Sequence, residues 1–166
     1  MNILDELLTI KKFREDQAEI IVMQKRLDHA EAISAEAEAV RCLESHQKQA
    51  IEKEKKLFDE LQGSLVKITE IEDVRAYIAK LALQTEKLQE NCLQANQQVA
   101  LALQAVEEAR NVLKRAEKVT EKFITLVNLQ DEAAFAEAER REDLELEEAA
   151  AVARERDEWQ PSEQEE

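Results

Sequence analysis

The sequence predicts an all-α fold: a long antiparallel two-helix coiled-coil hairpin with a helical acidic C-terminal extension. Three observations support this prediction. Charged residues make up 37% of the 166 residues and aromatic residues only 4%, a balance typical of long helices and coiled coils rather than of a globular core. An uninterrupted coiled-coil pattern follows residue 70. The single glycine, Gly63, lies between two helix-prone arms.

The second arm, at about residues 70–127, has the clearest pattern. Apolar residues recur there at alternating spacings of three and four, with only two threonines among them. The positions are Ile71, Val74, Ile78, Leu81, Thr85, Leu88, Cys92, Ala95, Val99, Ala102, Val106, Ala109, Leu113, Ala116, Thr120, Phe123 and Val127. This repeat predicts a left-handed coiled-coil seam. Because alanine recurs every seven residues from Ala95 to Ala116, a partner helix can approach closely, which favours antiparallel pairing.

The first arm, at about residues 3–61, is less regular. Its predicted seam begins with Ile10, Phe13, Gln17, Ile20, Gln24 and Leu27. After a phase slip of one residue, the seam continues through Ala30, Ile33, Ala37, Val40, Glu44, Gln47, Ile51, Glu54, Phe58 and Leu61. Polar members make this seam a poor surface for self-pairing. We therefore interpret it as the weaker half of a hairpin and expect a monomer.

Residues 62–69 are predicted to form the turn. Gly63 is costly inside a helix but favoured just past a helix end, where the backbone adopts a left-handed conformation. Thr69 followed by Glu72 fits a capping box that starts the second arm. Folding about residue 66 then places residue i opposite roughly residue 132 minus i, which matches the two arms in length. A bend within one continuous helix is the alternative.

The predicted organisation is a hairpin over residues 1–130, an acidic helical extension over 131–160 and a disordered tail over 161–166. Residues 131–166 hold fifteen acidic and four basic side chains, which accounts for most of the net charge of −15. This acidity disfavours nucleic-acid binding, since such binding depends largely on neutralising phosphates. The sequence shows neither a transmembrane stretch nor a signal peptide, so we expect a cytoplasmic protein.

The sequence contains no phosphate-binding loop, nucleophile elbow or metal-ligand motif. We therefore predict a protein that is not an enzyme and that needs no cofactor or metal. His29 and His46 have no nearby ligand pattern, whereas zinc requires four ligands, or three and a water. Cys42 and Cys92 are expected to be reduced thiols. The fold-back places them at about the same level, which leaves open whether they ever pair.

A group of basic residues lies near the free end of the first arm: Lys11, Lys12 and Arg14. The fold-back places them at about the level of Lys114, Arg115, Lys118 and Lys122. Like charges gathered at one level add no stability of their own. They are either solvated faces balanced by neighbouring acids or a contact surface for an acidic partner.

Aromatic residues mark the other end of the hairpin, where Phe58 and Tyr77 lie with Arg75 near the turn. Aromatic and arginine side chains are the most frequent at binding hot spots. Because Phe58 fits the predicted seam, we expect it to pack in the core, whereas Tyr77 lies one position off the seam.

Three segments resemble one protein family: "LLTIKKFREDQAE" near the N-terminus, "LFDEL" before the turn and "EKFITLVNLQDEAAFAEAERREDLELEEA" near the C-terminus. They are similar to the YscO (SctO) branch of the YscO/FliJ family, the coiled-coil stalk proteins of type III secretion and flagellar export. The resemblance implies a hairpin similar to the central stalk subunit of rotary ATP synthases. Its partners would be the hexameric export ATPase at the paired termini, the cytoplasmic domain of the export-gate protein at the other end, and export chaperones.

The resemblance also implies roles for particular residues. Candidates for ATPase contact are Lys11, Lys12, Arg14, Lys122 and Phe123. Leu57 and Phe58 match the family's pre-turn segment and, with Arg75 and Tyr77, are candidates for the export-gate end. The implied location is the base of a bacterial secretion apparatus, at the membrane only through partners. The alternatives are a homo-oligomeric coiled-coil scaffold and a holdase-type chaperone that grips unfolded clients.

Overall fold

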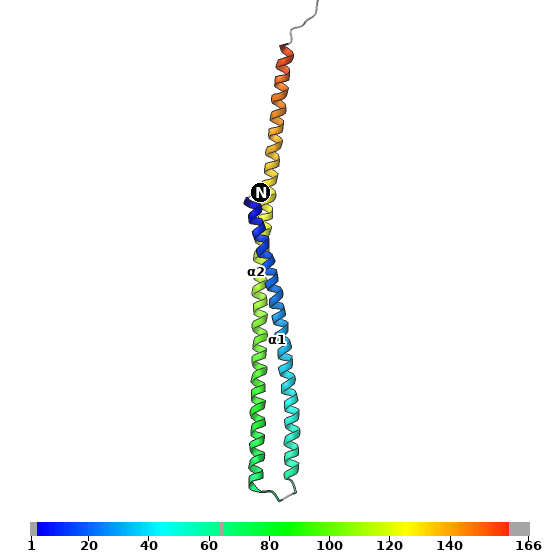
Figure 1. The fold of residues 1–166 in the computed structure, drawn as a ribbon, viewed down its shortest axis with the longest axis vertical. Coiled ribbons are helices and arrows are strands. Elements are labelled where there is room, and N and C mark those ends of the chain that lie inside the picture. The colour runs from blue at the N-terminus through cyan, green and yellow to red at the C-terminus, as the bar shows by residue number, and fades with distance from the viewer. Residues whose placement is uncertain (1–2, 64, 160–166) are drawn as a thin grey trace, which may run out of the picture. The chain divides into compact units, whose positions relative to one another are not determined.

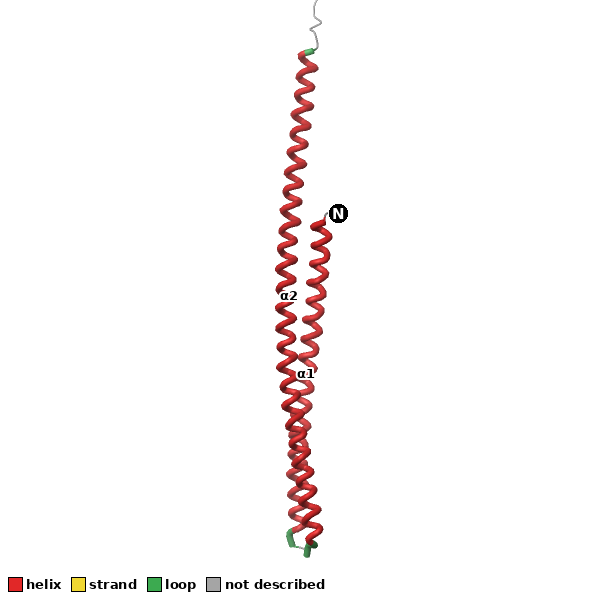
Figure 2. Tube along the Cα trace, turned by 90° about the vertical axis from the view of Figure 1, so that its left-hand side faces the viewer, coloured by secondary structure: helices red, strands yellow, loops and turns green. Residues whose placement is uncertain are grey.

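The computed structural model describes residues 3–63 and 65–159, which form two helices. Helix α1 spans Ile3–Leu61 and helix α2 spans Ile68–Glu158, and a short loop joins them (Figures 1 and 2). No strand occurs in this described part of the chain. The predicted all-α class is therefore confirmed, while the predicted tail over 161–166 lies outside the described residues.

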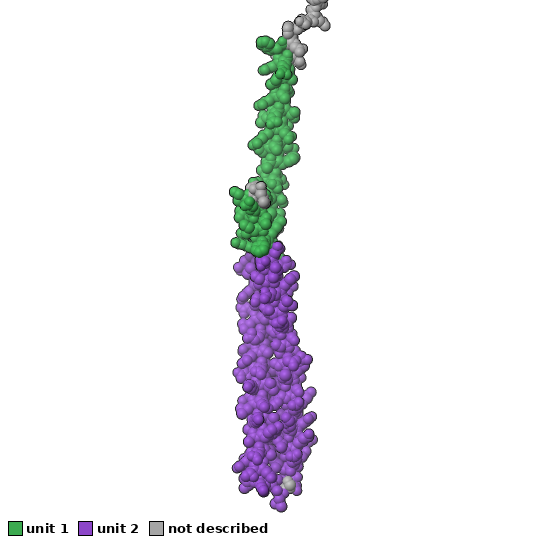
Figure 3. Space-filling model, viewed as in Figure 1, with its two compact units in different colours: residues 1–15, 116–166 green, residues 16–115 purple. Residues whose placement is uncertain are grey.

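The chain divides into two compact units, which Figure 3 shows in different colours. One unit contains Met1–Glu15 and Ala116–Glu166, and the other contains Asp16–Arg115. In the second unit, the two helices run antiparallel on either side of the loop (Figure 1). In the first unit, the N-terminal segment of α1 lies beside α2. Each unit therefore pairs segments that are far apart in the sequence.

Contacts between the helices follow the predicted fold-back. In the second unit, Asn96 Nδ2 donates a hydrogen bond to Glu36 Oε1 at 2.8 Å. In the first unit, Lys11 Nζ lies 5.4 Å from the centroid of the Phe123 ring. Both pairs agree closely with residue i facing residue 132 minus i. The antiparallel hairpin is confirmed.

The loop between the helices has the backbone that its glycine predicts. At the end of α1, the Gln62 N–H donates to the carbonyl oxygen of Phe58 at 3.1 Å. Gly63 follows with a φ of 93°, a left-handed conformation that side chains other than glycine rarely adopt. A Cβ added at Gly63 would meet no atom within 4 Å. The glycine is thus required by its backbone conformation and not by lack of space.

Helix α2 begins earlier than the predicted capping box. The Lys67 N–H donates to Glu70 Oε2 at 3.3 Å, and the Glu70 N–H donates to the Lys67 carbonyl oxygen at 3.0 Å. Lys67 therefore caps the helix, and Glu70 supplies the carboxylate that a capping box places three residues later. The predicted box of Thr69 and Glu72 is wrong. Glu70 accepts from the Lys67 N–H and lies in the first turn, where its negative charge interacts favourably with the helix dipole two residues sooner.

The predicted seam of the second arm is the face that α2 buries. From Val74 to Val127, every predicted seam residue is buried or half-buried, and Val106 and Ala109 are among the most buried residues of the chain. Only Ile71, the first predicted member, is exposed. The unbroken heptad pattern therefore identified the face of α2 correctly.

The predicted seam of the first arm is wrong. Its large apolar members are exposed, apart from the half-buried Leu61: Ile10, Phe13, Ile20, Leu27, Ile33, Val40, Ile51 and Phe58. From Leu4 to Ala50, the face that α1 turns inward keeps alternating spacings of three and four, and the same register passes through the exposed Lys53 to Leu57. Its members are Leu4, Leu8, Lys11, Glu15, Ala18, Val22, Lys25, His29, Ala32, Glu36, Ala39, Leu43, His46, Ala50 and Leu57. Phe58 in particular does not pack in the core.

The size of the side chains explains this choice of face. The inner face of α2 is lined by alanines at every seventh position from Ala95 to Ala116, which permits a close approach of the helices. Helix α1 meets it with its own small residues, Ala18, Ala32 and Ala39 among them. A face of Ile, Leu and Phe would hold the helices further apart and leave the alanines poorly packed. The inner face of α1 thus sets alanines, between longer side chains, against the alanine stripe of α2, while the largest apolar side chains of α1 stay exposed.

The acidic extension continues α2 without interruption, so that the helix is 91 residues long. From residue 128 to residue 156, all side chains are exposed. The helix is supported there by pairs such as Arg141 Nε with Glu137 Oε1, which lie one turn apart at 3.3 Å.

The inward face of α1 makes a testable prediction. Val22 is 5% exposed and Ile20 is 56% exposed. Val22→Asn buries an amide without a partner and should lower the free energy of unfolding by roughly 2 kcal/mol, whereas Ile20→Asn should change it by about 0.5 kcal/mol or less. Urea unfolding followed by circular dichroism measures both. If Ile20→Asn lowers the free energy of unfolding more than Val22→Asn does, the seam predicted from the sequence is the buried one and the observed inner face is contradicted.

Candidate functional site

The candidate residues for ATPase contact all lie in the first unit. Two of them touch each other: the Lys11 ammonium lies over the ring of Phe123, and both side chains are half-buried. A cation–π contact of this kind contributes about 0.5–1 kcal/mol where it is exposed to solvent. Lys11 and Phe123 therefore help to hold the N-terminal segment of α1 against α2, and are only partly available to a partner.

The remaining basic candidates in this unit are free to bind. Lys12, Arg14 and Lys122 are exposed, and none of them forms an ion pair with another described residue. The neighbouring acids Glu15 and Glu121 lie close in sequence but do not bind them directly. These three cations are exposed on the paired helices of the first unit, where Lys12 and Arg14, two residues apart, lie on different faces of α1. Each could contact an acidic partner.

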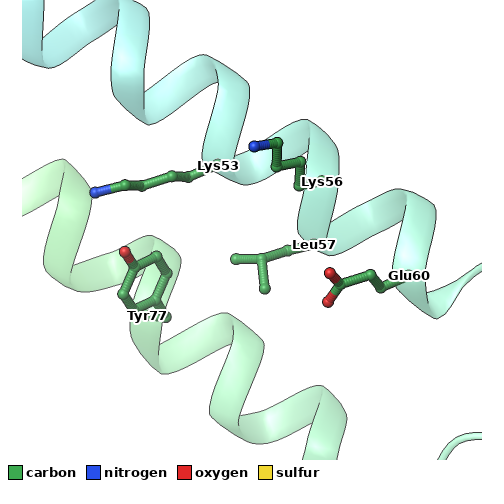
Figure 4. A pocket seen from close by; sticks show the side chains of 5 residues that line it. All are labelled: Lys53, Lys56, Leu57, Glu60 and Tyr77. Carbon is green, nitrogen blue, oxygen red and sulfur yellow. The ribbon is translucent and has the colours of Figure 1, made fainter.

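In the second unit, a groove opens between the helices next to the loop (Figure 4). It has a volume of about 280 Å³ and is lined by Lys53, Lys56, Leu57, Glu60 and Tyr77. Leu57 points from α1 toward the ring of Tyr77 on α2, and Lys53 lies along the same side of the hairpin. The groove thus combines Leu57 and an aromatic ring with two ammonium groups and the Glu60 carboxylate.

This groove brings together two of the four candidates for the export-gate end, Leu57 and Tyr77. Arg75 and Phe58 are exposed and do not line it. The prediction from sequence missed Lys53 and Lys56. The fold-back relation could have found both, because it places residue 77 opposite residue 55.

The structure offers no site for metal chemistry within its described residues. No group of three or more His, Cys, Asp and Glu side chains there could hold a metal ion. Cys42 is an exposed free thiol and Cys92 is a half-buried one. His46 Nε2 lies 3.3 Å from the Leu81 carbonyl oxygen, a contact that joins the two helices. Among the described helices, none has an apolar stretch long enough to cross a membrane.

Two long antiparallel helices that pair through seams at spacings of three and four place the chain in the class of coiled-coil hairpin proteins. Comparison with protein families identifies the family: the family model of the type III secretion protein YscO matches residues 4–152. The chain belongs to the YscO family. The members of this family are described as type III secretion proteins.

Two solved structures share the fold. The type III secretion protein YscO from Vibrio parahaemolyticus aligns with a TM-score of 0.83 and 23% identity, over 88% of this chain and 92% of that one. A YscO homologue from Chlamydia trachomatis aligns with a TM-score of 0.79 and 22% identity, over 96% of this chain and 98% of that one. A comparison with curated proteins found no match.

Proposed function

We propose that the protein is the central stalk, or coupling component, of a type III secretion export apparatus. In this role it links the hexameric export ATPase to the export gate and escorts export chaperones, by binding and without chemistry of its own. The observation that supports it most is that the two candidate contact surfaces lie in separate units of a helical hairpin of the YscO family. The proposed location is the base of the apparatus, where the protein meets the membrane only through its partners.

The proposed ATPase contact is the exposed basic group of Lys12, Arg14 and Lys122. Complementary charge sets the orientation and the rate of association, and rim charges act mainly on the association rate. The contact between Lys11 and Phe123 supports this surface, because it fixes the segment of α1 that carries Lys12 and Arg14. A surface held rigid before binding loses less conformational entropy on association.

The proposed export-gate contact is the groove of Leu57 and Tyr77. Tyrosine supplies a large contact area with few rotatable bonds, which is why it is frequent at hot spots. Lys53, Lys56 and Glu60 line the same groove, with a net charge of one positive unit from two lysines and one glutamate. We therefore expect an acidic segment of the gate protein's cytoplasmic domain to bind there, with an apolar side chain placed against Leu57.

The ATPase contact is tested by charge reversal at exposed positions. Lys12→Glu combined with Arg14→Glu should weaken binding to the purified export ATPase by about tenfold or more at low salt, mainly through slower association, and should reduce any stimulation of ATP hydrolysis. Surface plasmon resonance measures the association rate. The matched control is Lys80→Glu with Lys87→Glu, which reverses two exposed charges elsewhere on α2. If both double variants bind like the unchanged protein, the contact is wrong.

The export-gate contact is tested at Tyr77. Tyr77→Ala should weaken binding to the purified cytoplasmic domain of the gate protein by roughly tenfold or more, as expected for a hot-spot aromatic residue. Phe135→Ala removes an exposed ring from the extension and should have no effect. Lys53→Glu with Lys56→Glu is a second variant, which changes the groove without removing packed apolar atoms. Isothermal titration calorimetry that finds equal affinities for all of them would contradict the assignment.

A further inference from the structure

One buried hydroxyl in the first unit has no hydrogen-bond partner. Thr120 lies on the inner face of α2 and is 5% exposed, yet its Oγ1 forms no hydrogen bond with any described residue. Thr85, at the same seam position five heptads earlier, donates to the Leu81 carbonyl oxygen at 3.0 Å. A hydroxyl that is buried without a hydrogen bond costs free energy, because it gives up its bonds to water. Thr120 therefore opposes the pairing of α1 and α2 at its own level.

The segment of α1 that faces Thr120 is poorly matched to α2. By the fold-back relation, residue 120 faces residue 12, and the nearest inner-face residues of α1 are Lys11 and Glu15, both half-buried. Neither of them forms an ion pair with another described residue. The inner positions of residues 3–15 number four, and two of them are thus charged. Charged side chains on a coiled-coil seam lower its stability.

The apolar side chains of the same segment lie mainly on its other side. Residues 3–15 contain six large apolar side chains, and four of them are between 37% and 74% exposed: Ile3, Leu7, Ile10 and Phe13. Only Leu4 and Leu8 turn inward, and both are half-buried. The buried residues of α1, Ala18 and Val22, belong to the second unit. The segment therefore gains little from docking beyond two leucine contacts and the contact of Lys11 with Phe123.

We propose that residues 3–15 form an N-terminal latch, which opens reversibly from α2 while α1 and α2 stay paired in the second unit. Opening returns the Thr120 hydroxyl to water and releases the charged inner positions, which offsets the lost apolar contacts. The open form uncovers Phe123 and Val127, which are half-buried when the latch is docked. A partner that binds the open form would shift the equilibrium toward it. The latch does not depend on the proposed stalk function, and it is tested on this chain alone.

Thiol labelling at two buried seam positions tests the opening. In the full chain with Cys42→Ser and Cys92→Ser, Thr120→Cys and Val106→Cys each place one thiol at positions that are 5% and 3% exposed and two heptads apart. A soluble maleimide should modify position 120 at least about tenfold faster than position 106, once each rate is divided by that of the unfolded variant. Thr120→Cys removes the unpartnered hydroxyl and so reduces opening, which makes the comparison stringent. Equal rates would overturn the proposal.

Hydrogen exchange measured by mass spectrometry tests the cause. Thr120→Val replaces the hydroxyl with a methyl group, and should slow exchange of the backbone amides of residues 7–15 by about fivefold or more. These amides report opening, because an undocked helix of this length is only marginally stable in water. Exchange of residues 18–50 in the second unit should not change. If the segment only frays as any helix end does, Thr120→Val will leave residues 7–15 unaffected, which would contradict the latch.

Two neighbouring lysines provide a matched control. Lys11→Ala removes the contact with Phe123 and should speed exchange of residues 7–15 by about twofold or more. Lys12→Ala removes an exposed lysine and should have a smaller effect. Circular dichroism of each variant verifies that the helices are retained. Equal acceleration by both variants would also overturn the proposal, because the contact of Lys11 with Phe123 would then not hold the segment in place.

Discussion

The close contact between small residues of the two helices is the constraint on which the rest of the structure depends. The alanines of α2 from Ala95 to Ala116 allow α1 to approach closely, and α1 also has alanines on its inner face. Such packing favours one rotation of α1 about its axis, the one that turns Ala18, Ala32 and Ala39 inward between longer side chains such as Lys25 and His29. The position of every other side chain on α1, including the candidate contacts, follows from that rotation.

One consequence is that the larger apolar residues of α1 face solvent. Ile20, Leu27 and Ile51, for example, are all more than half exposed. The hairpin gains stability from fit along its whole length rather than from a thick core. The faces that it leaves exposed are then available for partners, which agrees with a protein that acts by binding.

Much of the fold could be predicted from the sequence. The repeat from Val74 to Val127 identified the buried face of α2, and Gly63 identified the end of α1. The buried face of α1 could not be found in the same way, because the prediction followed the most apolar stripe. The observed face includes Lys25, His29 and Glu36, which look like surface residues when a single helix is considered. Only the dimensions of the facing helix show that this stripe is the one that fits.

The candidate site was predicted less completely. Leu57 and Tyr77 were identified from their types and their place near the turn, but Lys53 and Lys56 contribute to their groove only through the pairing of the helices. The prediction also treated Lys11 as a contact residue, although the structure shows it packed over Phe123. Contacts between residues that are distant in sequence depend on the register, and the register depends on the choice of seam.

Disulfide cross-linking tests the choice of seam most directly, because residue 36 belongs to the observed inner face and residue 37 to the face that the sequence predicted. In a background with Cys42→Ser and Cys92→Ser, the pair Glu36→Cys and Asn96→Cys should form an intramolecular disulfide rapidly under mild oxidation. The pair Ala37→Cys and Asn96→Cys should react much more slowly, since Ala37 points away from α2. Non-reducing electrophoresis and mass spectrometry at low protein concentration measure both rates. Faster cross-linking through position 37 would contradict the account.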